Sequence, residues 1–258
     1  MKGILLIGHG SRYKYNEELL ELQAQRLREK GYKNVYVAYN ETSKPLIGEM
    51  MEKIAADGVK KLVALPFFIA SGIHFEKDIP RSIGIGEGNT KGVVKIGGKE
   101  IDVVFETPFG KDPVLAKAVY KKLSQFAPEG RKVGFLVVGH GSRLPYNKET
   151  IDHHASELSK MGLGDVRGAF NEFNEPSIED TMEALAKDGA EEIVVFPLFM
   201  ALGDHIKNDI PPKIGLEKGA KEGKAKFAGK EVFVRYIGPI GSDPMLTDVL
   251  VEKIKRNL

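Results

Sequence analysis

Three residues that can bind metals or accept protons recur in this chain at one constant spacing. The repeated pairs, each separated by 131 positions, are His9 and His140, Glu41 and Glu172, and His74 and His205. Two imidazoles and a carboxylate suit a borderline divalent ion such as cobalt, nickel, iron or zinc, and they would hold magnesium poorly. Neutral imidazole also accepts protons. Each half of the sequence therefore carries the residue types of a site that binds a metal ion or takes up protons.

The repeat extends far beyond these residues. Gly-His-Gly-Ser-Arg stands at 8–12 and again at 139–143, and the offset stays the same along both halves with no gap. The chain is therefore a tandem duplication. We expect two domains, residues 1–129 and 130–258, meeting near Pro128, and each is long enough to bury a core of its own.

Two further histidines are not repeated. His153 and His154 fall at the positions that Leu22 and Gln23 occupy in the first half. Because they lie in a polar helical stretch, we expect both at the surface.

Short apolar runs alternate with amphipathic stretches in each half. In the first half the predicted strands are residues 3–8, 34–39, 61–69 and 101–106, and the predicted helices are residues 15–30, 45–56 and a last one after Asp112-Pro113. Nearly continuous apolar strands separated by helices imply a parallel sheet covered on both faces. The predicted fold class is α/β, with two homologous doubly wound domains in tandem.

Prolines and glycines mark the expected helix ends. We expect Pro45 and Pro176 in the first turn of their helices, where proline is favoured. Gly58 and Gly189 follow the same two helices and are typical stop signals.

A segment rich in glycine and lysine lies between the third and fourth predicted strands of each half, at residues 84–100 and 215–231. One interpretation is a solvated hairpin that turns at Gly97 and Gly98. The other is a mobile basic lid, because long loops in compact domains are often lids.

The predicted topology brings the repeated polar residues together. In a sheet of order 2-1-3-4, the carboxyl ends of strands one and three flank the point where the strand order reverses, which is the usual place for a ligand. His9 follows strand one and His74 follows strand three. We therefore expect both in one crevice, with Glu41 reaching the same rim from strand two, and the second half should repeat the arrangement.

A single Gly-His-Gly-Ser-Arg motif has a simpler explanation as a tight turn between a strand and a helix. Its glycines would supply unusual dihedral angles, and Ser11 would cap the next helix. Two intact copies, each accompanied by a second histidine and a glutamate, favour a functional site.

The composition narrows the class of partner. With 38 basic and 36 acidic residues the formal charge is +2, so nothing indicates a nucleic-acid footprint or a basic membrane anchor. Without cysteine, any metal must be held by nitrogen and oxygen. The longest apolar stretch, residues 193–202, contains a proline and is too short to span a bilayer. We expect a soluble, cytoplasmic protein with small-molecule partners.

The motifs resemble those of a known family. Gly-His-Gly-Ser-Arg, the glutamate four residues before a proline, and the runs PFFIASGIHFEKDIP and PLFMALGDHIKNDIP are similar to the class II chelatases of the sirohydrochlorin cobaltochelatase (CbiX) type, over essentially the whole chain. Short archaeal members are single domains that pair as homodimers. This chain therefore resembles such a dimer fused into one polypeptide, and we expect a monomer.

The resemblance implies insertion of Co²⁺, or of Ni²⁺ or Fe²⁺, into sirohydrochlorin, with no ATP and no permanently bound cofactor. The sequence agrees, since it contains no GxxxxGK[ST] phosphate loop. The expected metal-delivering ligands or proton acceptors are His9, His74, His140 and His205. Glu41 and Glu172 would assist as bases or outer metal ligands.

The eight carboxylates of sirohydrochlorin need donors at the rim of the site. Residues near expected helix N-termini, where backbone N–H groups also favour anions, are candidates for this role. They are Ser11, Arg12, Ser142 and Arg143.

Two other functions use the same residues. A zinc hydrolase could hold its ion with two histidines and a glutamate and keep water at the fourth position, although no HExxH motif occurs. A metal or tetrapyrrole carrier could use the same crevice without catalysis. The sequence leaves open which metal is used and which half performs the chemistry.

Overall fold

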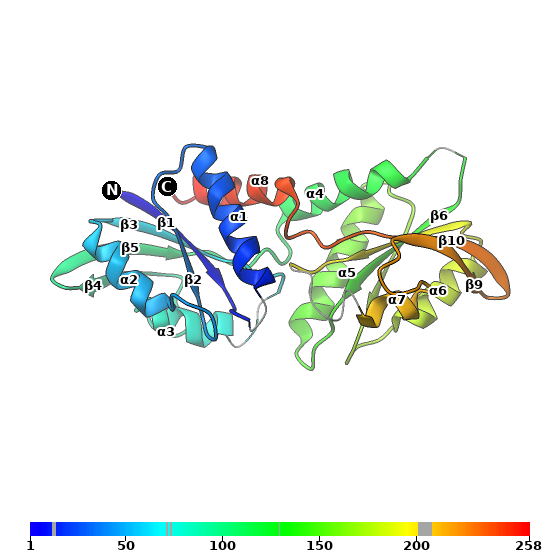
Figure 1. The fold of residues 1–258 in the computed structure, drawn as a ribbon, viewed down its shortest axis with the longest axis horizontal. Coiled ribbons are helices and arrows are strands. Elements are labelled where there is room, and N and C mark those ends of the chain that lie inside the picture. The colour runs from blue at the N-terminus through cyan, green and yellow to red at the C-terminus, as the bar shows by residue number, and fades with distance from the viewer. Residues whose placement is uncertain (12–13, 71, 73, 129, 201–207) are drawn as a thin grey trace. The chain divides into compact units, whose positions relative to one another are not determined.

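Two α/β units make up the computed structural model, which describes residues 1–11, 14–70, 72, 74–128, 130–200 and 208–258 (Figure 1). The first unit contains residues 1–110 together with 242–258, and the second contains residues 111–241. None of the helices in the described ranges combines the length and hydropathy needed to cross a lipid bilayer.

The first unit is built on a five-stranded sheet of order β2-β1-β3-β5-β4. Its elements are β1 (Lys2–Gly8), α1 (Tyr15–Glu29), β2 (Val35–Tyr39), α2 (Ile47–Ala56), β3 (Lys61–Pro66), a π-helical turn (His74–Asp78), α3 (Ile79–Ile83), β4 (Lys91–Ile96), β5 (Lys99–Phe105) and α8 (Pro244–Lys255). The strands β2, β1, β3 and β5 are parallel, as the apolar pattern predicts, and β1 is buried along its length after Lys2.

The second unit repeats this plan with the sheet order β7-β6-β8-β10-β9. Its elements are α4 (Pro113–Leu123), a 3-10 turn (Ser124–Phe126), β6 (Val133–Gly139), α5 (Pro145–Lys160), β7 (Asp165–Phe170), α6 (Ile178–Lys187), β8 (Glu192–Pro197), α7 (Ile210–Lys213), β9 (Glu222–Phe227) and β10 (Lys230–Tyr236). Its core between the sheet and α6 contains Leu136, Met182 and Val195.

The last helix of each repeat belongs to the other unit. In Figure 1, α8 (red), which ends the second repeat, lies beside α1 (blue) in the first unit, and α4, which ends the first repeat, packs on α5 in the second. Buried polar groups hold α8 in place, since the Thr247 hydroxyl donates to Gln23 Oε1 at 2.6 Å and Lys253 Nζ lies 3.3 Å from Glu106 Oε2. The compact units therefore do not coincide with the sequence repeats, and the expected boundary near residue 128 stays a prediction about the repeats.

The glycine- and lysine-rich segment forms an additional strand. We expected four strands in each sheet, but β4 pairs antiparallel with β5 and adds a fifth strand at the edge. The hairpin interpretation is confirmed, because the chain turns at Gly97 and Gly98, both with positive φ. The sequence does not predict this strand because its glycine and lysines are typical of a turn or loop, and an edge strand does not need a continuous apolar run.

Two further expectations are wrong. Helices α2 and α6 begin two residues after Pro45 and Pro176, which follow cis peptide bonds and lie outside the first turn. His154 is buried at 0% exposure, because it lies on the apolar face of α5 with Ile151 and Leu158.

Candidate functional site

The sheet itself brings His9 and Glu41 together. The parallel ladder between β1 and β2 continues past the strand ends, where the Asn40 N–H donates to the Gly8 carbonyl and the Glu41 N–H donates to the His9 carbonyl at 3.0 Å. The second unit has the same continuation, since the Glu172 N–H donates to the His140 carbonyl at 3.0 Å. Each histidine and glutamate pair is thus fixed by backbone at the carboxyl edge of its sheet.

The second glycine of each Gly-His-Gly-Ser-Arg motif makes this approach possible. A Cβ atom on Gly10 would lie 1.7 Å from the carbonyl oxygen of Glu41, and one on Gly141 would lie 1.6 Å from that of Glu172. Both glycines also have positive φ, at 93° and 88°. Glycine at this position therefore allows the loop after the first strand to contact the loop that carries the glutamate.

In the first unit the two side chains form a close pair at the surface. His9 Nε2 lies 3.5 Å from Glu41 Oε1, and the two side chains are 46% and 54% exposed. The His9 ring also meets Phe68, just beyond β3, edge to face at 6.4 Å between centroids. The ends of the first three strands therefore converge on one rim, as the topology predicts.

In the second unit the imidazole is held differently. His140 Nδ1 lies 3.0 Å from the carbonyl oxygen of Gly141, and the ring lies 6.1 Å from that of Phe199. With its proton on Nδ1, the ring donates to this carbonyl, and Nε2 is then the acceptor nitrogen of the ring. Asn171, next to Glu172, is buried and accepts hydrogen bonds from Lys213 Nζ at its backbone carbonyl and at Oδ1. These bonds fix the position of the loop that carries Glu172.

The expected serines stabilise the loops. The Ser11 N–H donates to the Ser43 hydroxyl, and the Ser142 N–H donates to Asn174 Oδ1. The Ser142 hydroxyl in turn accepts from the Leu144 N–H just before α5. The N-cap residues of α1 and α5 are Lys14 and Leu144, so neither serine occupies the capping position that was considered for Ser11. Ser43 and Asn174 escaped the sequence analysis because they occupy equivalent positions but differ in type.

The rim of the second unit carries an exposed aromatic residue that the sequence analysis missed. Phe173, next to Glu172, is 59% exposed, and the Arg143 guanidinium lies 5.6 Å from the centre of its ring. Its φ of 63° is left-handed, a conformation that costs on the order of 1 kcal/mol for a residue with a side chain. Thr42, the equivalent residue in the first unit, has the same conformation with a φ of 64°.

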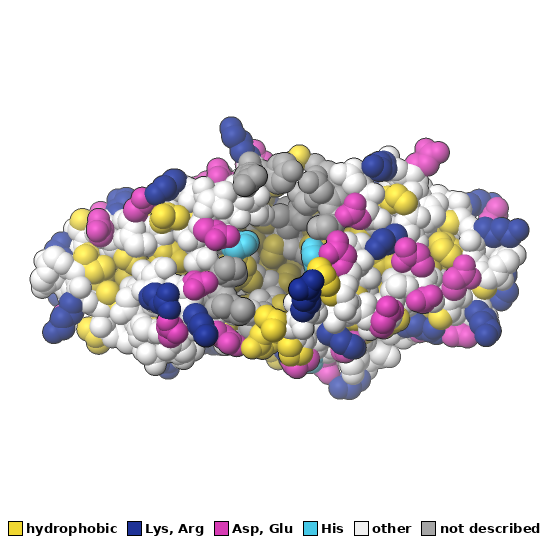
Figure 2. Space-filling view, turned by 90° about the horizontal axis from the view of Figure 1, so that it is seen from below, with side chains coloured by type: hydrophobic (Ala, Val, Ile, Leu, Met, Phe, Trp, Pro, Cys, Tyr) yellow, Lys and Arg dark blue, Asp and Glu magenta, His cyan; other side chains and the backbone are white. Residues whose placement is uncertain are grey.

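Three expected site residues are described in part or not at all. His74 begins the π-helical turn between β3 and α3, but its side chain lies outside the described part of the structure, as do Arg12 and His205. Among the side chains that the structure does describe, no group of three or more histidine, aspartate and glutamate residues has the arrangement of a metal site. Figure 2 shows histidine side chains at the surface beside acidic ones.

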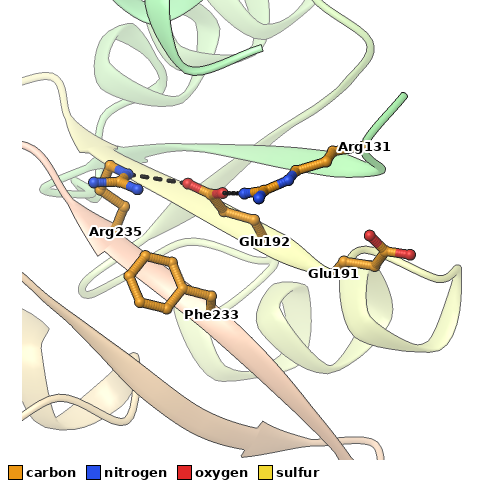
Figure 3. A pocket seen from close by; sticks show the side chains of 5 residues that line it. All are labelled: Arg131, Glu191, Glu192, Phe233 and Arg235. Carbon is orange, nitrogen blue, oxygen red and sulfur yellow. Dashed lines mark hydrogen bonds and ion pairs between the residues drawn. The ribbon is translucent and has the colours of Figure 1, made fainter. Parts of the chain in front are cut away.

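A pocket lies at the opposite, amino-terminal edge of the second sheet. Its lining residues, shown in Figure 3, are Arg131, Glu191, Glu192, Phe233 and Arg235. The Glu192 side chain, only 7% exposed, lies between the two arginines, 3.0 Å from Arg235 Nε and 3.7 Å from Arg131. These charges neutralise one another and are not repeated in the first unit, where Lys60 and Lys61 replace the two glutamates. The pocket is therefore separate from the duplicated site.

Comparison with known proteins identifies both the repeat and the fold. The CbiX family model matches residues 3–126 and again residues 134–257. A sirohydrochlorin cobaltochelatase of Methanosarcina barkeri is 38% identical over 125 residues, which make up 48% of this chain and 95% of that protein.

Two solved structures resemble the whole chain. SirB from Bacillus subtilis with Fe³⁺ aligns with a TM-score of 0.75 and 18% identity, covering 99% of this chain and 95% of that one. The sirohydrochlorin chelatase SirB from the subspecies spizizenii, in complex with cobalt, aligns with a TM-score of 0.67 and 17% identity, covering 99% and 94%. At these identities the likeness establishes a shared two-unit fold.

Proposed function

We propose, since the chain belongs to the CbiX family, that it is a chelatase that inserts a divalent metal ion into sirohydrochlorin. The observation that carries the proposal is the pair of His9 and Glu41 at the carboxyl edge of the sheet, with Nε2 and Oε1 3.5 Å apart. The same two residue types, in the same backbone arrangement, recur as His140 and Glu172.

The spacing in the first unit suits two ligands of one metal ion. Ligand atoms about 2.1 Å from a tetrahedral ion lie about 3.4 Å apart, close to the distance between His9 Nε2 and Glu41 Oε1. Both side chains are about half exposed, so an ion bound there remains accessible. Such an open site can hold the metal substrate weakly and release it to a second set of nitrogen ligands.

Metal insertion also releases the two pyrrole N–H protons of the macrocycle. A neutral imidazole or a carboxylate within hydrogen-bond reach can accept them. The contact between His140 Nδ1 and the Gly141 carbonyl favours the tautomer in which Nε2 is the acceptor. We assign metal delivery to His9 and Glu41, with His74 as the further ligand, and proton uptake to His140 and Glu172, with His205 assisting.

The finer assignments rest on the chemistry of the substrates. Co²⁺ is the metal that we favour, with Ni²⁺ and Fe²⁺ as alternatives, since nitrogen and oxygen ligands suit all three. Ser11, Arg12, Ser142 and Arg143 would bind carboxylates of the macrocycle. Because the chain holds two copies of the family unit, we propose that a monomer binds one tetrapyrrole.

The absorption spectrum of sirohydrochlorin tests the proposal. Metal-free sirohydrochlorin is mixed with the protein and with Co²⁺, Ni²⁺ or Fe²⁺ separately, and the spectrum is followed against a sample without protein. We expect faster conversion to the metallated spectrum with at least one metal. A spectrum that shifts on binding, with no acceleration of insertion, would indicate a carrier.

Metal analysis of the purified protein tests the hydrolase alternative. A zinc hydrolase would retain zinc at one equivalent or more through purification. A chelatase that passes its metal on should be purified largely without it.

A further inference from the structure

The two units differ at one exposed position of the rim. Phe173 follows Glu172 and Thr42 follows Glu41, and both have the same left-handed backbone with φ near 63° and 64°. A left-handed conformation is uncommon for a residue as bulky as phenylalanine. Phe173 is nevertheless 59% exposed, so burial in the core does not explain why this residue is a phenylalanine.

A cation lies against the Phe173 ring. The Arg143 guanidinium is 5.6 Å from the ring centre, within the range of a cation–π contact. The two loops are joined by the Ser142 N–H, which donates to Asn174 Oδ1 at 2.8 Å. Among the described residues, no carboxylate lies within ion-pair distance of Arg143. The guanidinium is thus positioned next to an apolar ring while its charge remains available to an anion.

We propose that Phe173 and Arg143 form a platform that receives the edge of the tetrapyrrole. The phenyl ring would contact the apolar face of the macrocycle, and the guanidinium would pair with a carboxylate on its periphery. A flat aromatic ring bordered by carboxylates is complementary to this pair in both shape and charge. The inference rests on the proposed function and adds a residue that determines how the substrate is held.

The platform is a feature of the second unit alone, since Thr42 supplies no ring at the equivalent place. The two rims therefore carry different chemistry. In the first unit His9 and Glu41 would bind and deliver the metal ion. In the second unit Phe173 and Arg143 would orient the macrocycle.

The chain offers a matched pair of variants. Asparagine tolerates the left-handed conformation, so Phe173→Asn removes the ring without adding backbone strain, and Thr42→Asn makes the same replacement at the equivalent position. Phe173→Tyr retains the ring. Binding of metal-free sirohydrochlorin is measured by absorbance titration, and KM and kcat are then measured with Co²⁺.

We expect Phe173→Asn to weaken binding and raise KM by about tenfold with kcat little changed, because the ring holds the substrate equally in the ground and transition states. Thr42→Asn and Phe173→Tyr should stay within about twofold of the parent. Arg143→Gln should also weaken binding, and should reduce its dependence on salt.

Three results would overturn the platform. Equal affinities for Phe173→Asn and Thr42→Asn would show that the ring does not contact the macrocycle. An unchanged affinity in Arg143→Gln would remove the role of the guanidinium. A parent that elutes as a dimer and a Phe173→Asn variant that elutes as a monomer would assign the ring to self-association. If the parent protein binds no sirohydrochlorin, the proposed function fails together with the platform. In the other three results the parent still binds sirohydrochlorin, so only the platform fails.

Discussion

The rims of the two units carry the same histidine and glutamate but surround them differently. In the first unit His9 faces Glu41, whereas in the second unit His140 Nδ1 contacts its own backbone and Lys213 braces the neighbouring Asn171. Duplication has therefore preserved the histidine and the glutamate while their surroundings have diverged. This difference is the basis of our proposal that the first unit delivers the metal and the second unit holds the macrocycle.

Far from the rim, the contacts are preserved and the residue types change. Tyr36 in β2 donates to Asp57, and the equivalent residues in the second unit are Arg167 and Asp188, which form an ion pair. Burial and the bond to Asp57 raise the pKa of Tyr36 to about 12. A structural contact can thus be made by different chemistry, but the repeated histidines and glutamates have not been replaced in this way.

The largest expected effect concerns the second pair of histidines. His74→Ala and His205→Ala should each reduce the rate of metal insertion, because the first removes a proposed metal ligand and the second a proposed proton acceptor. The loss should be about a hundredfold in the more important half, which is the contribution of a positioned proton acceptor. The two halves should be unequal. Steady-state rates are compared with those of His153→Ala, a half-exposed histidine of α5 that serves as the control. Unchanged rates in both single variants and in the double variant would exclude these residues.

The second prediction concerns the two glycines that allow the histidine loop to contact the glutamate loop in each unit. Gly10→Ala and Gly141→Ala should each lower the free energy of unfolding by about 2 kcal/mol or more, because the new Cβ would overlap a carbonyl oxygen. Gly58→Ala is the control, since Gly58 also has positive φ but has nothing within 4 Å of a Cβ, and it should cost only about 1 kcal/mol. Denaturant unfolding gives all three values, and equal losses would show that the close approach does not matter.

Much of the fold and part of the site follow from the sequence. The constant offset of 131 and the continuous apolar strands predict the duplication, the order of the parallel strands and the rim shared by His9 and Glu41. The exchange of α4 and α8 could not be predicted in this way. The apolar face of a helix shows that the helix packs on a sheet, but it does not show on which of two homologous sheets.

The burial of His154 and the exposure of Phe173 could not be predicted from the sequence either. Comparing the two halves detects positions where the residue type is the same, but Gln23 and His154 differ in type while both are buried. The same comparison overlooks Phe173, because its counterpart is Thr42. Only the backbone angle and the exposure of the ring draw attention to it.

A smaller effect should follow from the buried bond that holds α8 on α1. Thr247→Val removes the donor to Gln23 Oε1 in a fully buried place and should cost about 1–3 kcal/mol of stability. Thr90→Val makes the same change at an exposed position and should cost less than about 0.5 kcal/mol. Equal midpoints of thermal unfolding in the two variants would argue that the contact does not stabilise the exchanged helix.

The smallest effect concerns acid stability at the equivalent contacts of β2 and β7. Hydrogen bonds from Lys53 and then Tyr36 lower the pKa of Asp57 below its ordinary 3.8, and the hydrogen bond from Arg167 lowers that of Asp188. Since the folded pKa is depressed, each carboxylate stabilises the fold above about pH 4, and this contribution is lost as the pH falls through the lowered pKa. Asp57→Asn and Asp188→Asn should therefore make the melting temperature less sensitive to pH below 4, and an unchanged pH profile in both variants would contradict the assignment.

The proposed difference in role between the two units is tested most directly by the initial rates of metal insertion in His9→Ala and His140→Ala, measured side by side with Co²⁺ and saturating sirohydrochlorin. If His9 and Glu41 deliver the metal as proposed, His9→Ala should lose about a hundredfold in rate, the upper range of losses at metal sites, and raising the Co²⁺ concentration should restore part of it. His140→Ala should lose less, and added Co²⁺ should not restore its rate. Equal losses in the two variants, or a larger loss in His140→Ala, would contradict the assignment of metal delivery to the first unit.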